Sequence, residues 1–463
     1  MISKFIDRKE ELSLLEEEWK KKNGRLIIVY GRRRIGKTKL LTEFVSGKKG
    51  IFYIAEDTSP KIQIDGLKEK IAEFMEDNLL KTLEIKDWDQ LFGYLARNSP
   101  PERFYLLIDE FSYLAKSDKR ILSVLQKYWD TSFATSNICI LLSGSMLGLM
   151  SEMVLSYASP LYGRRSRDIL LEGLSFRYSK EFFNMPLQQA LEMYMTIGGV
   201  PEYLLKASEY TNFSDFVEKE FFNKYGYFYR EPYFIISQEF KELKTYFSIL
   251  NAIAYGNTKP AEIANFSGLN AREIYPYLEN LIRLGFIERQ VSIIGNPKKG
   301  IYLIKDPIFD FWFNFVFKYR EEIERGIFNL KNKNELISSF FGKKFEAFVL
   351  NEFILNLLPA YQKIGKWWHK DEEIDIVALN DEKKEIVFVE CKWSRLGVRE
   401  ATKILTDLKR KANLVKWHNS ERKEHYGIIA KTIEEKEILR ENGYLAFDLK
   451  DFNTVFNIRK NYA

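Results

Sequence analysis

A glycine-bounded loop between an apolar run and a helical pattern constrains this sequence more than any other feature. Leu26–Tyr30 is a short run of high strand propensity, and an apolar pattern typical of a helix follows the loop. Between them, Gly31–Thr38 reads GRRRIGKT, which matches G-x-x-x-x-G-K-[ST] at every required position. Such glycines let backbone N–H groups approach phosphate oxygens, and the helix N-terminus adds partial positive charge. Strand, loop and helix together predict a phosphate-binding turn, in preference to a chance match.

The residues of this loop have predicted roles in binding ATP and Mg²⁺. The Lys37 ammonium group is expected to reach the β- and γ-phosphates, and the Thr38 hydroxyl is expected to ligate Mg²⁺. The residues predicted to surround the nucleotide are Gly31, Arg32, Arg33, Arg34, Ile35, Gly36, Lys37, Thr38 and Lys39.

An apolar run that ends in two acids is the second feature. Phe104–Ile108 is typical of a buried parallel strand, and Asp109 and Glu110 follow it directly. Asp109 at the strand end is placed to hold Mg²⁺ through water, and Glu110 to polarise an attacking water. Because this pair accompanies the glycine loop, the sequence favours ATP hydrolysis over binding alone.

A third strand and a basic loop supply further candidate residues. Residues 137–150 predict a strand that ends in Ser143 and Ser145. In ATPases with an extra strand between the two motif-bearing strands, such a position often senses the γ-phosphate. Ser143 is the candidate, and an ordinary serine at a strand end is the alternative. Residues 160–174 carry three candidates for an arginine finger, namely Arg164, Arg165 and Arg167, although a solvated basic loop explains them equally well.

Six segments in order along the chain resemble the archaeal-type ATPase family, a group of AAA-related, STAND-like P-loop ATPases. They are FIDRKEELSLLEEEW, VYGRRRIGKT, LLIDEFSYL, LSGSMLGLM, PLYGRRS and GGVPEYLL. The resemblance covers roughly residues 1–235. It implies a parallel sheet in which other strands flank the strand before the glycine loop, followed by a helical lid.

Residues 243–304 predict a winged helix-turn-helix. Three short helical patterns precede two apolar extended pieces, which the sequence GNPKKG separates. Asn270 with Glu273 predicts a capping box for the third helix. The side chains placed to meet a nucleic acid are Arg272, Tyr275 and Asn280 on that helix, and Lys298 and Lys299 at the tip of the wing.

Two features of the same segment oppose a role in DNA binding. Pro276 lies beyond the expected first turn of the third helix, where it should remove a backbone hydrogen bond and cause a kink. Glu273 and Glu279 would place negative charge in a DNA groove. DNA contact and a packing role therefore both remain open for this segment.

Two charges interrupt an apolar strand near the C-terminus. In EIVFVECKWS, Glu390 and Lys392 are two positions apart and therefore lie on one face of a strand. The preceding strand holds Asp375 and connects through a short polar turn, so pairing is expected to bring Asp375 opposite Glu390. Two carboxylates this close repel unless a cation separates them, and Mg²⁺ suits oxygen ligands. Such a metal, with a lysine nearby, can activate water for attack on a phosphodiester.

Asp375, Glu390 and Lys392 resemble the core motif of the PD-(D/E)XK nuclease superfamily. The helix predicted over residues 341–358 carries Glu346, where that superfamily often has a helical acid. The resemblance implies that Glu346, Asp375 and Glu390 bind a metal and that Asp375, Glu390 and Lys392 act in cleavage. No proline precedes the aspartate, which departs from the motif. A degenerate fold, or a surface salt bridge between Glu390 and Lys392, is the alternative.

The predicted fold class is α/β, with a P-loop parallel sheet and lid, a winged helix-turn-helix, and an α/β nuclease-like domain. The expected domain ranges are 1–235, 236–310, a connector over 311–340, and 341–463. ATP and Mg²⁺ are the expected cofactors, and DNA or another nucleic acid is the expected partner. A homo-oligomer is left open. The alternative function is a STAND-like switch that acts through protein partners, with an inactive nuclease-like domain.

Composition and charge bear on the partners and the cellular compartment that we expect for this protein. The net charge of +6 permits nucleic-acid binding without requiring it. Cys139 and Cys391 both lie in apolar runs, which suits a reducing compartment. No apolar run approaches the roughly 18 residues of a membrane helix, and the N-terminal segment has no secretory core. The expected location is the cytoplasm, with no membrane partner.

Overall fold

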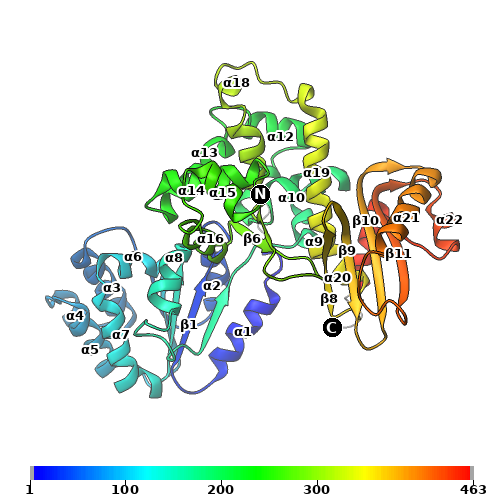
Figure 1. Ribbon diagram of the computed structural model, residues 1–463. Helices are drawn as coiled ribbons and strands as arrows, with labels where there is room; N and C mark the ends of the chain where they lie inside the picture. Colours follow the sequence, from blue (N-terminus) through cyan, green and yellow to red (C-terminus); the bar gives the residue numbers. More distant parts are fainter. Residues whose placement is uncertain (1–4, 459–463) are drawn as a thin grey trace. The chain divides into compact units, whose positions relative to one another are not determined.

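The computed structural model describes residues 5–458 and divides into two compact units (Figure 1). Unit 1 comprises the described residues up to Leu174 together with Val200–Tyr203. Unit 2 comprises Ser175–Gly199 and the described residues from Leu204 onward.

Unit 1 is built on a five-stranded parallel sheet. Its strands are β1 (Arg25–Tyr30), β2 (Gly50–Ile54), β3 (Phe104–Asp109), β4 (Ile138–Gly144) and β5 (Arg167–Leu170). They lie in the order β2-β3-β4-β1-β5, so β4 separates the strand before the glycine loop from the strand that ends in Asp109. Every residue of β3 and β4 is buried, as expected for parallel strands covered on both faces.

Helices cover this sheet, and their apolar side chains pack with those of the strands in one core. They are α1 (Lys9–Lys20), α2 (Lys37–Val45), α3 (Pro60–Phe74), α4 (Asn78–Thr82), α5 (Trp88–Asn98), α6 (Phe111–Ser117), α7 (Arg120–Thr131) and α8 (Leu147–Met150). Alternate strand residues, such as Leu106 and Ile108 of β3, pack with residues of α3, α5, α6 and α7 in one apolar core. Figure 1 shows these four helices gathered on one side of the sheet.

The first part of unit 2 is helical. It contains α9 (Phe176–Ser179), α10 (Leu187–Ile197), the end of α11 (Pro201–Ala207), α12 (Phe213–Glu220) and α13 (Tyr227–Glu239). Residues 175–199 and 204–235, which the sequence assigns to the lid of the ATPase, therefore pack within unit 2. Three further helices follow, α14 (Leu243–Ala254), α15 (Pro260–Ser267) and α16 (Ile274–Arg283), and then a hairpin of β6 (Ile287–Gln290) and β7 (Ile301–Ile304).

Helix α16 begins later than the sequence predicts. Its first residue is Ile274, so Pro276 occupies the first turn, where a backbone N–H has no partner within the helix. Pro276 therefore removes no hydrogen bond within the helix, and the reason for predicting a kink there does not apply. Asn270 is not the N-cap, and of the predicted capping box one bond is present, from the Asn270 N–H to the Glu273 carboxylate at 3.4 Å.

An apolar connector leads to a mixed sheet. The connector holds α17 (Pro307–Phe311), a π-helical turn over Trp312–Phe317, and α18 (Arg320–Glu324). Helix α19 (Asn334–Phe348) then precedes β8 (Lys363–His369), β9 (Glu372–Asn380) and β10 (Glu385–Leu396). Helix α21 (Val398–Ala412) and the strands β11 (Lys423–Ile433) and β12 (Leu445–Asp448) complete this part of unit 2, with the short helices α20 (Ile354–Leu357), α22 (Lys436–Glu441) and α23 (Phe452–Ile458).

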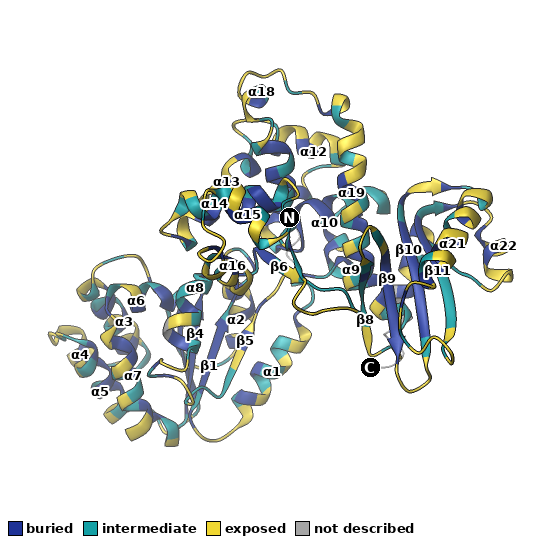
Figure 2. Cartoon of the chain, in the orientation of Figure 1, coloured by how far each residue is buried: buried dark blue, intermediate teal, exposed yellow. Residues whose placement is uncertain are grey.

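The sheet order is β12-β11-β10-β9-β8, which leaves β8 at one edge. Strands β8, β9 and β10 are antiparallel, whereas β10, β11 and β12 are parallel. Leu405 and Leu408 of α21 pack with Ile386 and Phe388 of β10 in one core. Trp367 belongs to the same core, and Figure 2 shows the central strands as buried.

Candidate functional site

The glycine loop joins β1 to α2 in unit 1. A Cβ atom on Gly31 would lie 2.5 Å from the carbonyl oxygen of Leu171, so only glycine fits there without a shift. Gly36 has φ 91°, a conformation that favours glycine, and α2 begins at the next residue. The Lys37 ammonium group is buried under the loop and donates to the carbonyls of Gly31 at 3.0 Å and Arg32 at 3.1 Å. The loop thus has the curled form that phosphate binding requires.

The basic residues of the loop point in different directions. Arg33 and Lys39 are exposed. Arg34 has φ 69° and its guanidinium lies 3.3 Å from a carboxylate oxygen of Glu202, a residue that belongs to the same unit.

Arg8, just before α1, makes a hydrogen bond to the backbone of the glycine loop. Its guanidinium donates to the carbonyl of Ile35 at 3.4 Å and to the carbonyl of Glu172 at 2.6 Å, and it pairs with Glu11 at 2.9 Å. Arg8 is 7% exposed and adopts φ 69°. No local pattern singles out Arg8, because its contact with Ile35 spans 27 positions.

Thr38 and Asp109 bring two oxygen ligands together beside the loop. The Thr38 hydroxyl donates to Asp109 Oδ2 at 2.6 Å, and Asp109 is 2% exposed. From the neighbouring strand β4, the Ser143 hydroxyl donates to Asp109 Oδ1. A hydroxyl and a carboxylate next to a phosphate loop are a donor set that fits Mg²⁺.

Glu110 is held by a residue that the sequence did not assign. Its backbone has φ 53°, and its N–H donates to Asp109 Oδ1 at 3.0 Å and to Ser143 Oγ at 3.3 Å. Its carboxylate oxygen Oε2 accepts from the Ser145 hydroxyl at 2.6 Å and from the Ser145 N–H at 3.2 Å. Ser145 therefore fixes the orientation of the carboxylate that was predicted to polarise water.

The three candidate finger arginines have acidic partners within unit 1. Arg164 makes two 2.8 Å bonds to Asp130. Arg165 lies 3.1 Å from Asp168. Arg167 lies 3.2 Å from the carboxylate of Glu18.

Asp375, Glu390 and Lys392 lie together in unit 2. The antiparallel pairing of β9 with β10 ends at Ile376 and Val389, which are the chain neighbours of Asp375 and Glu390. The Cys391 N–H donates to Asp375 Oδ2 at 2.8 Å. Asp375 is 5% exposed and Glu390 is 4% exposed. The Lys392 ammonium group lies 2.9 Å from Glu390 Oε2 and 3.7 Å from Asp375 Oδ2. It therefore bridges the two carboxylates.

Lys366 of β8 joins the same group and was not predicted. Its ammonium nitrogen lies 3.0 Å from Glu346 Oε2, 3.2 Å from Glu373 Oε2 and 3.9 Å from Asp375 Oδ1. Its side chain is 18% exposed. Alternation along β8 predicts which face of the strand Lys366 lies on, but it does not predict the partners of Lys366, since Lys363 on the same strand has a different partner.

Lys411 of α21 contacts Glu390 from the other side, with 3.0 Å between its ammonium nitrogen and Glu390 Oε1. Burial raises the pKa of Asp375, and the charges of Glu390 and Glu346 add to that increase. Burial would also raise the pKa of Glu390, but Lys392 and Lys411 outweigh it and lower that pKa. We call these six residues the acid–lysine cluster: Glu346, Asp375, Glu390, Lys366, Lys392 and Lys411.

The acid–lysine cluster is not arranged as a metal site. Across residues 5–458, no three histidine, cysteine, aspartate or glutamate side chains converge so that they could hold a metal ion. Ammonium groups instead contact each carboxylate of the cluster. The residues predicted as Mg²⁺ ligands in unit 2 therefore do not fit that ion in this arrangement.

Of the side chains predicted to contact a nucleic acid, four are exposed and Asn280 is hydrogen-bonded within the protein. Arg272 is exposed, as is Tyr275, whereas the Asn280 amide donates to the Tyr246 hydroxyl at 2.6 Å. Lys298 and Lys299 are exposed in the turn between β6 and β7. A groove beside α16 has three glutamates in its wall, Glu242, Glu273 and Glu279.

The sheet order, the glycine loop and the acids at the end of β3 define a P-loop ATPase. A model of the ATPase domain predominantly from Archaea matches residues 5–207, and a model of archaeal and bacterial proteins of unknown function matches residues 312–404. The chain is 38% identical over 461 residues to the uncharacterized protein MJECL04 of Methanocaldococcus jannaschii, an alignment that covers 97% of this chain and 100% of that protein. The chain belongs to the same family as that protein. The prediction of an archaeal-type ATPase is confirmed.

Solved structures resemble the chain more distantly. The Walker-type ATPase PABY2304 of Pyrococcus abyssi has a TM-score of 0.47 and 22% identity, covering 67% of this chain and 96% of that one. The ORC2 protein of Aeropyrum pernix has a TM-score of 0.43 and 14% identity, covering 70% and 95%. Among the helices described for residues 5–458, none combines the length and the apolar character needed to cross a membrane.

Proposed function

We propose that this ATPase couples its nucleotide state to the binding of nucleic acid, with DNA as the favoured ligand of unit 2. The observation that carries the ATPase part is the contact of Thr38 with Asp109 beside a curled glycine loop. The nucleic-acid part is supported by three helices followed by a hairpin, and by Asp375, Glu390 and Lys392 on adjacent strands.

In unit 1, each residue has a separate task. The backbone N–H groups at the start of α2 and the Lys37 ammonium group bind the β- and γ-phosphates. Thr38 and Asp109 would hold Mg²⁺, which neutralises charge on the phosphate oxygens when it is bound. Glu110 orients and polarises the attacking water, and Ser145 keeps its carboxylate in place. Arg8 keeps the loop in shape through Ile35.

In unit 2, we propose that residues 236–310 form a winged helix-turn-helix and that residues 341–463 form a PD-(D/E)XK-like domain. The order of α19, three strands, α21 and β11 supports the second assignment. The exposed Lys298 and Lys299 suit phosphate contacts.

The test of coupling is the affinity for labelled duplex and single-stranded DNA in the presence of ADP or of a slowly hydrolysed ATP analogue. We expect the two nucleotides to change the dissociation constant by about fivefold or more, as is typical of coupled sites. In Lys37→Ala the difference should vanish, whereas Lys49→Ala, a change at an exposed lysine outside the loop, should retain it. Equal affinities in both nucleotide states of the wild-type protein would reject coupling.

Two observations favour a second function, a nucleotide-dependent switch that acts through protein partners. Glu242, Glu273 and Glu279 line the groove beside α16, and carboxylates there repel phosphates. In addition, lysines neutralise the acid–lysine cluster.

Cleavage tests the activity of the nuclease-like domain, and DNA binding separates the two functions. Supercoiled plasmid incubated with Mg²⁺ or Mn²⁺ should be cut by the wild-type protein and not by Asp375→Ala if the nuclease-like domain is active. Equal results for the two proteins would reject that activity, and the absence of DNA binding in both nucleotide states would support the switch.

A further inference from the structure

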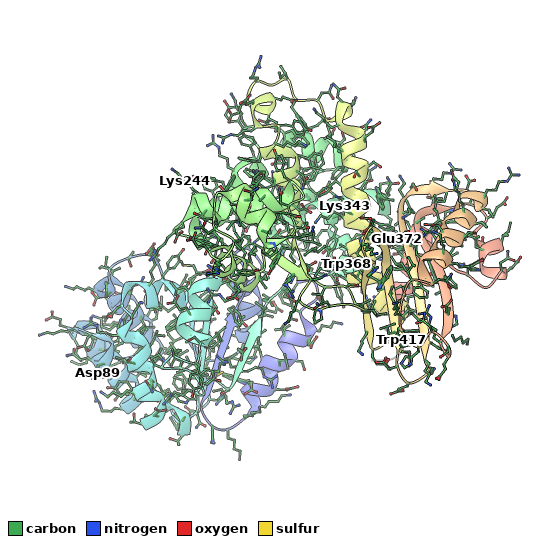
Figure 3. The ribbon with its side chains drawn as sticks, in the orientation of Figure 1. Asp89, Lys244, Lys343, Trp368, Glu372 and Trp417 are labelled. Carbon is green, nitrogen blue, oxygen red and sulfur yellow. The ribbon has the colours of Figure 1, made fainter. Side chains whose placement is uncertain are left out.

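The turn between β6 and β7 lies against the edge of the C-terminal sheet. We call residues 291–300 the hairpin loop. The Ile293 N–H donates to the Lys366 carbonyl at 2.9 Å. The Ser292 hydroxyl accepts from the Trp368 N–H at 3.1 Å and lies 3.3 Å from the Trp368 carbonyl, to which it donates. Trp368 is labelled in Figure 3. The hairpin loop therefore pairs with β8, the edge strand of the sheet.

Apolar packing reinforces these hydrogen bonds. Ile293 and Ile294 pack against the core beneath α21. A Cβ atom on Gly365 would lie 3.3 Å from the Cβ of Ile293, so the absence of a side chain there admits the loop closely. Edge strands expose unpaired backbone groups, and covering an edge with a loop keeps it from pairing with another chain. The hairpin loop serves this purpose here.

Lys366 connects the hairpin loop to the acid–lysine cluster. Its carbonyl accepts the bond from Ile293, while its ammonium group contacts Glu346 and Asp375. Burial alone would lower the pKa of Lys366, but the carboxylates around it outweigh burial and raise that pKa. The ammonium group therefore stays charged among the acids.

Within the six residues of the cluster the charges balance, and two carboxylates outside it add negative charge, Glu373 at 3.2 Å from Lys366 and Asp407 at 3.6 Å from Lys411. Three carboxylates, those of Glu346, Asp375 and Glu390, face three ammonium groups, those of Lys366, Lys392 and Lys411. A divalent cation needs several carboxylate oxygens that it can approach without meeting positive charge. Lys366 lies between Glu346 and Asp375, which come from different elements.

We propose that Lys366 is the resident counter-ion of the acid–lysine cluster, held there by the hairpin loop, and that it excludes divalent metal ions from the cluster. Lys366 is in this sense a positioning residue, because it fixes the Glu346 and Asp375 carboxylates. The inference rests on the proposed function only in treating this cluster as the site of a nuclease-like domain. It explains why the residues of the superfamily motif are adjacent without forming a metal site.

The experiment measures Mn²⁺ binding by calorimetry and by electron paramagnetic resonance, with nucleotide absent and with Asp109→Ala as the background, because Asp109 supplies the carboxylate that would hold a metal ion in unit 1. In that background we expect Lys366→Met to bind Mn²⁺ at least about tenfold more tightly, because a unit positive charge has left the carboxylates. Lys363→Met is the matched control, since Lys363 lies on the same strand but pairs with the exposed Asp381. It should not change Mn²⁺ binding.

A second variant tests the role of the hairpin loop without touching the cluster. Ile293→Pro removes the N–H that bonds to Lys366, and we expect it to tighten Mn²⁺ binding in the same direction. Circular dichroism and a thermal melt establish that each variant is folded. If folded Lys366→Met and Ile293→Pro both bind Mn²⁺ no better than their parent, the inference is wrong.

The Mn²⁺ measurements and the tests of the proposed function can succeed or fail independently. Tighter Mn²⁺ binding without DNA binding or cleavage would reject the nuclease-like role and leave Lys366 as the counter-ion. Unchanged Mn²⁺ binding would reject the counter-ion role, whatever the protein does to DNA.

Discussion

At the scale of single residues, the orientation of Glu110 depends on Ser145. The two hydrogen bonds from Ser145 leave the Glu110 carboxylate little freedom to rotate, and the backbone of Glu110 is itself fixed by bonds to Asp109 and Ser143. A general base must be held within hydrogen-bonding distance of the water it activates. With Glu110 in its proposed role, Ser145 is the residue that positions its carboxylate.

The first prediction concerns this serine. Ser145→Ala removes the 2.6 Å bond to Glu110 and should lower kcat for ATP hydrolysis about tenfold while KM stays unchanged, because the change affects orientation and not ATP binding. Ser145→Thr keeps the hydroxyl and should restore most of kcat. Steady-state kinetics measure both quantities. A parental kcat in Ser145→Ala would show that Ser145 does not position Glu110.

At the scale of elements, Glu18 ties α1 to the sheet of unit 1. Its carboxylate lies 2.7 Å from Lys21, 2.5 Å from Arg25 of β1 and 3.2 Å from Arg167 of β5. The side chain is only 1% exposed, so its charge depends on these partners. One residue therefore couples a helix to two neighbouring strands.

The second prediction follows from this network. Glu18→Gln removes a buried carboxylate charge from three partly exposed cations and should lower the free energy of unfolding of unit 1 by about 2 kcal/mol. Glu17→Gln is the matched control, because the Glu17 side chain is 58% exposed and lies 3.6 Å from Arg167. Chemical denaturation at neutral pH measures the difference. Equal stabilities of the two variants would contradict the role of Glu18.

The interactions of Glu18 also predict how the stability of unit 1 depends on pH. Burial would raise the pKa of Glu18, but hydrogen bonds from Lys21 and Arg25 outweigh it and lower the pKa below its ordinary value. A lowered carboxylate pKa contributes stability above the ordinary pKa, and this contribution is lost as pH falls through the pKa of the folded state. The stability difference between wild type and Glu18→Gln should therefore shrink below about pH 4.

At the scale of the whole molecule, the chain comprises two units with different candidate ligands. The nucleotide residues lie in unit 1, whereas the helices α14–α16, the hairpin loop and the acid–lysine cluster lie in unit 2. Within unit 2, the hairpin loop joins the helical part to the C-terminal sheet.

The last prediction tests whether the units behave separately. We expect calorimetry of the whole chain to give two unfolding transitions, of which ATP with Mg²⁺ raises only one. At a ligand concentration of 100 times Kd, the stabilisation should be about 2.7 kcal/mol. Lys37→Ala should abolish the shift. A single transition that moves as a whole would mean that the two units unfold together.

The nucleotide site was predictable because most of its determinants are local. The residues from Gly31 to Thr38 are consecutive, and Asp109 and Glu110 directly follow an apolar run. Their meeting requires only that the two strands lie near each other in a parallel sheet, and they do, with β4 between them. The hairpin of β9 and β10 was likewise readable from a short polar turn, and pairing across it sets Asp375 beside Glu390.

Other residues acquired their roles only in the folded chain. Ser145 is 35 positions from Glu110, and Arg8 is 27 positions from Ile35. Lys366 meets Glu346 from a different element, and the hairpin loop meets β8 across more than 70 positions, as the 76 between Ser292 and Trp368 show. The phosphate loop, the acidic pair and the class of the protein can be predicted from the amino-acid sequence alone, because short-range spacing encodes them. The counter-ions of the acid–lysine cluster and the residues that support the glycine loop and Glu110 become apparent only in the folded chain, because they depend on strand order and on contacts between distant segments that no local pattern records.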